Sequence, residues 1–146
     1  MDLKFQVQLK IRKPVAQVFD AVVDHRKLSG YFIETATGPL APGVTVMWKF
    51  PEFDESFPVT AREVVKDERV VFEWGSAVGE GLNTVEIVFK PLDGGNTLVQ
   101  ISEAGWPETQ AGITASQGNA GGWMHMLAAM KGSLEYGINL RAGGAF

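Results

Sequence analysis

The chain has 146 residues, of which 17 are acidic and 13 basic, so its formal net charge is -4. This length is that of one ordinary domain, and we expect a single domain over residues 1–146. A negative chain without a Lys/Arg cluster is unsuited to nucleic acid, so no nucleic-acid partner is expected. The absence of cysteine excludes a disulfide framework and a thiolate nucleophile.

The hydropathy of the chain indicates a soluble protein. The N-terminal residues from Met1 to Lys4 lack the apolar core of a signal peptide. The longest apolar runs fall far short of the ~20 residues that a helix needs to cross a bilayer. We therefore expect a cytoplasmic protein without a membrane span.

The first elements follow from two different periodicities. Apolar and polar residues alternate from Phe5 to Arg12, which predicts a strand with one buried face. Pro14 then stands where a first helical turn accepts proline, and apolar residues recur at helical spacing as far as Val22. A short amphipathic helix is predicted there, with a further partial helical turn at residues 28–32.

Alternation returns between residues 44 and 105, interrupted by turn signals such as Asp93-Gly94-Gly95-Asn96. This pattern predicts an antiparallel meander of about six strands. The alternating residues are Val44, Val46, Trp48 and Phe50; Phe57, Val59 and Ala61; Val70, Phe72 and Trp74; Val85, Ile87 and Phe89; and Thr97 to Glu103.

A long helix is predicted to begin after Asn119 and to end near Leu140. Apolar residues follow one another there at steps of four, three, four and four, which places them on one stripe that should pack against the sheet. The stripe consists of Trp123, Leu127, Met130, Leu134 and Ile138. The glycine-rich segment from Gly105 to Gly122 is expected to precede the helix, either as a mobile lip of a cavity or as an ordinary surface loop.

The stretch from Gly122 to Met126 reads GWMHM and raises the question of a metal site. Consecutive helical residues point about 100° apart, so Met124, His125 and Met126 cannot converge on one ion. We expect His125 to face solvent or an interface. Two histidines without cysteine or a nucleophile-elbow pattern favour neither a His/Cys metal site nor a Ser-His-Asp triad, and no metal or cofactor is expected.

The order of these elements is similar to the helix-grip fold of the START-like, Bet v-like superfamily. Residues 122–135 resemble the "GWxxxLxxLKxxLE" helix of the family named for the activator of the ninety-kilodalton heat-shock protein ATPase. Residues 14–32, 70–74 and 97–105 resemble three further stretches of that family. The resemblance implies an α+β fold in which a curved antiparallel sheet of about seven strands wraps around a long C-terminal helix, with two short helices after the first strand.

The same resemblance implies a hydrophobic cavity between sheet and helix. Large side chains that could line this cavity, or that could equally fill an ordinary core, are Tyr31, Trp48, Phe72, Trp74, Trp123, Leu127 and Met130. Strand parity leaves open whether Glu103 or Ser102 faces inward. An inward Glu103 could bind or protonate a ligand, although an exposed carboxylate at a strand end is the commoner case.

Three functions are compatible with these features. The first is a binding protein for a small hydrophobic molecule, without catalysis. The second is a co-chaperone-like interaction module, which predicts a filled interior and an exposed apolar patch. The third is an enzyme of the polyketide cyclase or aromatase type, for which Glu103 and Tyr31 are the candidate acid/base groups and which rests on fold analogy. The sequence leaves the ligand and the oligomeric state open.

Overall fold

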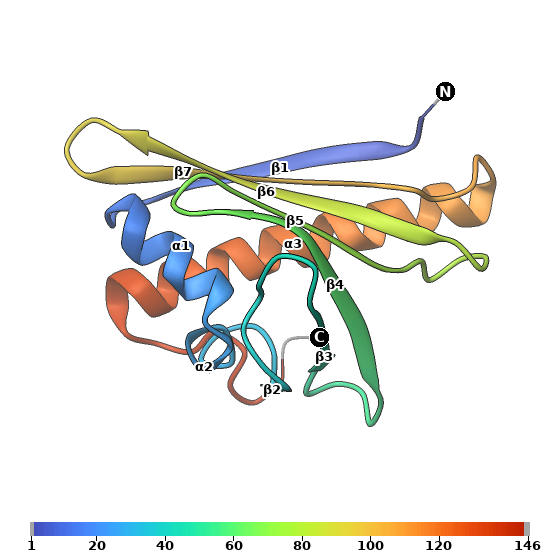
Figure 1. Cartoon of the computed structure of the whole chain (residues 1–146), viewed down its shortest axis with the longest axis horizontal. Helices are drawn as coiled ribbons and strands as arrows, with labels where there is room; N and C mark the ends of the chain where they lie inside the picture. Colours follow the sequence, from blue (N-terminus) through green and yellow to red (C-terminus); the bar gives the residue numbers. More distant parts are fainter. Residues whose placement is uncertain (1, 145–146) are drawn as a thin grey trace.

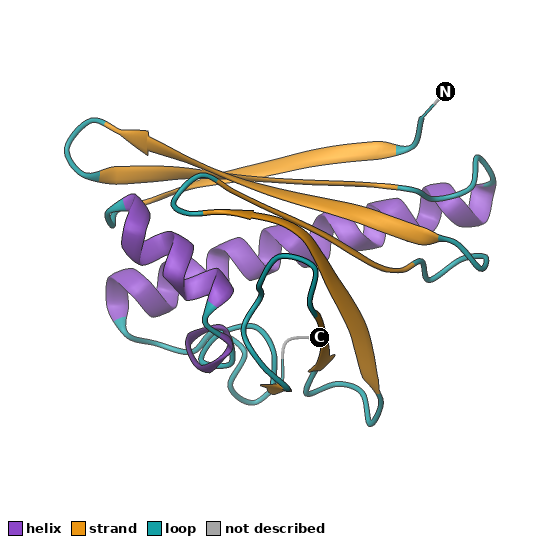
Figure 2. Cartoon of the chain, in the orientation of Figure 1, coloured by secondary structure: helices purple, strands orange, loops and turns teal. Residues whose placement is uncertain are grey.

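The computed structural model describes residues 2–144 and contains one antiparallel sheet and three helices. The sheet has the strand order β1-β7-β6-β5-β4-β3-β2 and curves over the long helix α3, while α1 and α2 close one end (Figures 1 and 2). The elements are β1 (Lys4–Ile11), α1 (Val15–Val23), α2 (His25–Leu28), β2 (Thr35–Ala36), β3 (Thr45–Lys49), β4 (Ser56–Val65), β5 (Arg69–Gly75), β6 (Leu82–Leu92), β7 (Asn96–Ala104) and α3 (Gln110–Tyr136). The predicted helix-grip architecture is confirmed.

The inner face of the sheet follows the alternation in the sequence. On β7, Thr97, Val99, Ile101 and Glu103 are buried while the residues between them are only partly covered. The same parity holds on β6 from Asn83 to Phe89. The polar residues Asn83 of β6 and Glu103 of β7 therefore face α3 together with the apolar residues of these strands.

Helix α3 begins at Gln110 and not after Asn119, which corrects the predicted start. The side-chain oxygen of Thr109 accepts a hydrogen bond from the backbone N–H of Gly112 and caps the helix. A Cβ on Gly112 would lie 1.9 Å from the carbonyl oxygen of Pro107, so only glycine fits this close approach. Most of the segment expected to be a loop is thus helical, because packing outweighs the low helix propensity of glycine.

The end of α3 also differs from the prediction. The helix stops at Tyr136 because Gly137 adopts a left-handed conformation, with φ of 67°, and its N–H bonds back to Ser133. Ile138 and Leu140 lie beyond the helix and are exposed, so Ile138 does not continue the buried stripe. The buried face of α3 consists of Gly112, Trp123, Met126, Leu127, Ala129, Met130 and Gly132.

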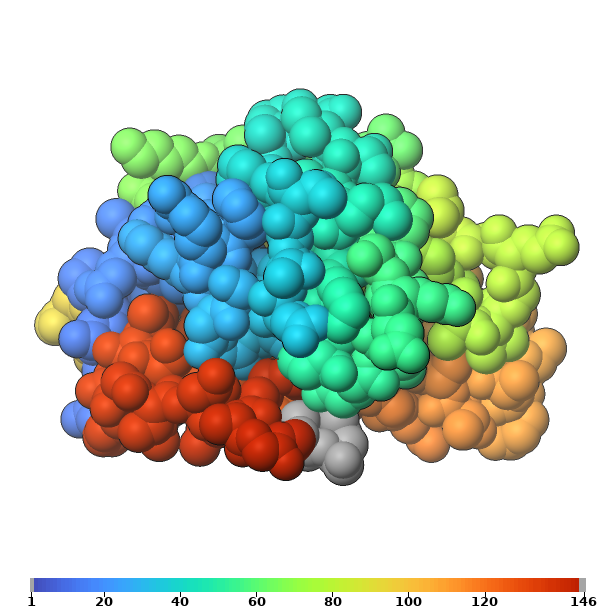
Figure 3. Space-filling view, turned by 90° about the horizontal axis from the view of Figure 1, so that it is seen from below, coloured from blue at the N-terminus to red at the C-terminus, as the bar shows by residue number. Residues whose placement is uncertain are grey.

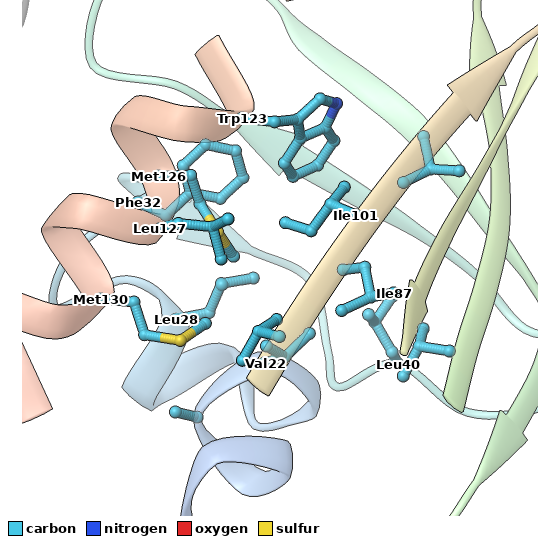
Figure 4. Packing of buried hydrophobic residues seen from close by; sticks show 14 of the residues in the cluster. Val22, Leu28, Phe32, Leu40, Ile87, Ile101, Trp123, Met126, Leu127 and Met130 are labelled. Atoms are coloured by element: carbon cyan, nitrogen blue, oxygen red, sulfur yellow. The ribbon is translucent and has the colours of Figure 1, made fainter. Parts of the chain in front are cut away.

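Trp123, Met126 and Leu127 point from α3 toward Ile101 on β7, and Met130 points toward Leu28 of α2 (Figure 4). This is the helix-to-sheet packing that the apolar stripe predicted. No helix among residues 2–144 is both long and apolar enough to cross a membrane.

Glu135 ties the last turns of α3 to the end of β1. Its carboxylate accepts hydrogen bonds from the backbone N–H and side chain of Arg12 and from Lys131, and its side chain is only 3% exposed. Burial alone would raise the pKa of Glu135, but these hydrogen bonds outweigh it and lower the pKa to about 2. Arg12 and Lys131 therefore hold an ionised group at this contact.

Candidate functional site

A pocket of about 430 Å³ opens between the first half of α3, the loop from β3 to β4 and the C-terminal segment. Its volume lies within the range of small-molecule sites. The residues that line it are Phe32, Phe50, Glu52, Phe53, Trp74, Gly118, Asn119, Gly122, Trp123 and Arg141. The C-terminal segment, red in the view from below, lies against the blue-green surface that precedes β4 (Figure 3).

The pocket wall is aromatic. Trp123 from α3 lies 5.5 Å from Trp74 of β5 and 5.5 Å from Phe32, measured between ring centroids. Phe50 completes the group at 5.2 Å from Phe32 and 6.5 Å from Trp74. Phe53 stands at the mouth with a relative exposure of 55%. The rings thus form a continuous apolar wall that remains open to solvent on one side.

Behind this wall lies Glu103, which is only 1% exposed. Its Oε2 accepts hydrogen bonds from Trp74 Nε1 and Asn83 Nδ2, both at 2.9 Å. Its Oε1 accepts one from Trp123 Nε1 at 2.8 Å, and Asn119 Nδ2 lies 3.1 Å from each oxygen. Because indole and amide N–H groups only donate, both carboxylate oxygens act as acceptors.

The sheet register explains why these groups meet. Trp74 pairs with Asn83 across β5 and β6, and Val85, the next inward residue on β6, pairs with Glu103 of β7. Asn119 and Trp123 are four residues apart on α3 and so share the face that meets these strands. Three strands and one helix are therefore joined through a single carboxylate. We call Glu103 with Trp74, Asn83, Asn119 and Trp123 the Glu103 cluster.

The glycines of α3 leave room for the pocket. Gly118 and Gly122 line it from successive helical turns, and a Cβ built on either would meet no atom within 4 Å. Gly121 has equally open surroundings but does not line the pocket. The glycine-rich segment thus contributes to the cavity as a helix with little side-chain bulk.

The polar end of the pocket is formed by Arg141 and Glu52. The guanidinium of Arg141 donates a hydrogen bond to the carboxylate of Glu52, and its Cζ lies 5.8 Å from the centroid of the Phe32 ring. The Arg141 side chain is 7% exposed, and its Nε has no hydrogen-bond partner among the described residues. This guanidinium is therefore held by one carboxylate and an aromatic face.

The structure separates the residues suspected from the sequence into two groups. Trp74 and Trp123 line the pocket, and Glu103 binds both of them from behind. The other suspected side chains are buried in the core and do not line it: Trp48, Phe72, Leu127 and Met130. Glu103 faces inward, so the commoner case of an exposed carboxylate does not apply here.

Tyr31, the other suspected acid/base group, does not line this pocket but a second one of about 190 Å³. Its hydroxyl donates a hydrogen bond to the backbone oxygen of Ala21 at 3.0 Å. Burial raises the pKa of Tyr31, which keeps the phenol protonated. The phenolic proton therefore lies in the hydrogen bond to the Ala21 oxygen.

His125 is half-buried, because the covered part of α3 is broader than the predicted stripe. Met126 is buried, whereas Met124 is only partly covered. The structure does not leave His125 fully exposed to solvent, and a place at an interface stays a prediction.

Several pocket residues were not singled out from the sequence. Phe50 was recognised only as a strand residue, while Phe53 and Glu52 belong to a loop and Arg141 follows the predicted helix end. The sequence pattern could have pointed to Asn83 and Asn119 as inward-facing residues. Asn83 has the inward parity of β6, and Asn119 stands four residues before Trp123 on the same face of α3.

Comparisons with known proteins agree with the fold. The family model described as "Activator of Hsp90 ATPase homolog 1-like protein" matches residues 12–135. Protein SSP2350 of Staphylococcus saprophyticus shares 23% identity at a TM-score of 0.81, with 95% of this chain and 96% of that chain covered. The Aha1 dimer of Colwellia psychrerythraea shares 14% identity at a TM-score of 0.75, with 92% and 98% covered.

A third similar structure is DynU16, a protein of the dynemicin biosynthetic locus, at 19% identity and a TM-score of 0.78. The alignment covers 92% of this chain but 48% of DynU16. No curated protein matches the sequence significantly. At these identities the solved structures support the fold alone.

Proposed function

The chain belongs to the Activator of Hsp90 ATPase homolog 1-like family and has the START-like fold, and from this premise we propose that it binds a small hydrophobic molecule in the aromatic pocket. The observation that carries the proposal is the pocket of about 430 Å³ walled by five aromatic side chains. A volume of this kind with few polar groups suits a ligand of drug-like size. Trp48 and Phe72 would then support the wall, because the Trp48 ring lies 6.2 Å from that of Trp74 and the Phe72 ring 6.2 Å from that of Trp123.

Binding without catalysis is favoured because both candidate acid/base groups are already hydrogen-bonded within the protein. Trp74, Asn83, Asn119 and Trp123 donate to the Glu103 carboxylate, and the Tyr31 hydroxyl donates to the backbone oxygen of Ala21. General acid or base catalysis needs a group within hydrogen-bond reach of the substrate. A cyclase-like reaction would have to use another residue.

A co-chaperone role has less support from the architecture. That function predicted a filled interior and a contiguous exposed apolar patch. The pocket supplies unfilled space instead. The exposed apolar residues Val44, Leu82 and Tyr136 lie just before β3, at the start of β6 and at the end of α3. The name of the family refers to a chaperone activator, so contact with a chaperone remains a second, separate proposal.

Gly122→Leu tests the binding proposal, because its new side chain would enter the pocket without meeting another atom at Cβ. Gly121→Leu is the matched control, with the same helix and the same gain in helix propensity, about 0.5–1 kcal/mol. Titration with the neutral fluorophore N-phenyl-1-naphthylamine should show binding to the wild type and to Gly121→Leu. We expect at least a tenfold loss of affinity for Gly122→Leu, about 1.4 kcal/mol.

The proposal fails if the wild type does not bind the fluorophore or if Gly122→Leu binds it as well as Gly121→Leu does. Thermal unfolding of both variants checks that the substitutions leave the fold intact.

A further inference from the structure

The charges around the pocket are unevenly distributed. Of the described residues that line it, Arg141 is the only basic one, and Glu52 already pairs with it. Glu103 lies directly behind the indoles and is bonded to donors that carry no formal charge. The surroundings of the aromatic wall therefore hold one more carboxylate than cationic groups.

The aromatic wall itself attracts positive charge. The face of an indole or phenyl ring is electron-rich, and tryptophan is the strongest of these partners for a cation. The indole N–H groups of Trp74 and Trp123 both donate to Glu103. Donation to an anion polarises the indole and strengthens the negative potential of its ring. The carboxylate of Glu103 therefore strengthens the attraction of Trp74 and Trp123 for a cation.

One organic cation already occupies the edge of this wall. The Arg141 guanidinium lies over the Phe32 ring, pairs with Glu52 and is almost fully buried. It belongs to the segment after α3 and is held there by the chain itself. One ring of the wall, that of Phe32, thus already faces a planar cation.

We propose that the ligand of this pocket is a hydrophobic organic cation, such as an aryl- or alkylammonium, whose charged group lies over the indoles of Trp74 and Trp123. This inference rests on the proposed binding function and specifies the chemistry of the ligand. Glu103 supplies the negative charge behind the rings. Arg141, over the neighbouring Phe32 ring, competes with the ligand because the two positive charges repel each other within one pocket. An anionic ligand is disfavoured because it would face both Glu52 and Glu103.

Two probes of equal shape test the charge preference. Benzyltrimethylammonium and neopentylbenzene differ only in the replacement of the cationic nitrogen by carbon. Quenching of tryptophan fluorescence should show about tenfold tighter binding of the cation to the wild-type protein, a ratio typical of cation–π contacts that are partly desolvated. Equal or tighter binding of neopentylbenzene would overturn the inference.

Variants at Arg141 test the competition. Arg141→Met should raise the ratio of the benzyltrimethylammonium affinity to the neopentylbenzene affinity about threefold to tenfold relative to the wild type. Arg62→Met removes an equal charge on β4, where Arg62 is exposed and pairs with Glu73, and should change neither affinity. Loss of cation binding in Arg141→Met, with an unchanged melting temperature, would contradict the proposed competition.

The outcomes separate this inference from the binding function. If both probes bind equally and Gly122→Leu abolishes both, the pocket binds ligands but has no preference for cations. If neither probe binds, the inference of a cationic ligand fails, whereas the binding function is decided by the titration with N-phenyl-1-naphthylamine. The comparison of the two probes on the wild-type protein tests the preference for a cation even if Arg141→Met does not fold.

Discussion

Glu103→Gln is the substitution that examines the Glu103 cluster most closely. The glutamine side chain has nearly the same shape but replaces one acceptor oxygen by an NH2 group that only donates. If its oxygen stays with Trp74 and Asn83, the NH2 group faces the indole N–H of Trp123, at the position where Oε1 now accepts at 2.8 Å. One buried indole, and part of the Asn119 contact, then loses its acceptor.

The cost follows from the donors left unsatisfied. Each buried donor without an acceptor costs about 1–3 kcal/mol, so we expect Glu103→Gln to destabilise the fold by about 2–4 kcal/mol. Urea unfolding followed by tryptophan fluorescence measures this difference. Glu86→Gln is the control, because Glu86 lies on the outer face of β6 and pairs loosely with Arg69 at 3.4 Å; its effect should stay below about 0.5 kcal/mol.

A contrary result has a clear physical meaning. Burying a charge without a cationic partner is costly, and removing such a charge can stabilise a protein. If Glu103→Gln is as stable as the wild type or more so, the four neutral donors do not compensate for that cost. The idea that they hold the carboxylate and the indoles in place would then be refuted.

Two further predictions concern α3. Gly112→Ala should destabilise the fold by at least about 2 kcal/mol, because its Cβ would collide with the Pro107 carbonyl oxygen. Gly121→Ala should stabilise the fold by about 0.5–1 kcal/mol, because alanine has the higher helix propensity and its Cβ meets no neighbour. Thermal unfolding compares the two variants. Since the folded pKa of Glu135, about 2, lies below the ordinary value of 4.5, its ionised form stabilises the protein above about pH 4.5, and this contribution is lost as the pH falls toward 2. The wild type should be more stable than Glu135→Gln by about 1–2 kcal/mol, after allowance for solvent screening at the exposed Arg12. Urea unfolding at stepped pH should show this difference shrinking between about pH 4.5 and pH 2. A difference that stays constant with pH would contradict the prediction.

Much of the fold could be predicted because alternation and helical spacing are local properties of the sequence. The inward rows of β5, β6 and β7 follow from parity, and the burial of Trp123, Leu127 and Met130 on α3 follows from the 3.6-residue period. The start of α3 could not be predicted in this way. Gly112, Gly118 and Gly122 read as loop residues, and only the contact with Pro107 and the tertiary packing reveal why the helix runs through them.

The candidate site was only partly accessible from the sequence. Trp74 and Trp123 could be suspected as aromatic residues on inward faces, and the position of Glu103 depended on a parity that the alternation left undecided. Arg141 could not be identified, because its place over Phe32 depends on how the chain turns back after Gly137. The pocket as a whole depends on the distances between elements, and local periodicity carries no information about those.

The most direct test of the account is an NMR titration of the wild-type protein that follows the indole N–H signals of its four tryptophans. Trp74 and Trp123 line the pocket, whereas Trp106 packs on Phe5 outside it. Addition of N-phenyl-1-naphthylamine should shift the signals of Trp74 and Trp123 in a saturable way and leave the Trp106 signal in place. Uniform shifts of all the indole signals, or none at Trp74 and Trp123, would contradict a ligand-binding site in this pocket.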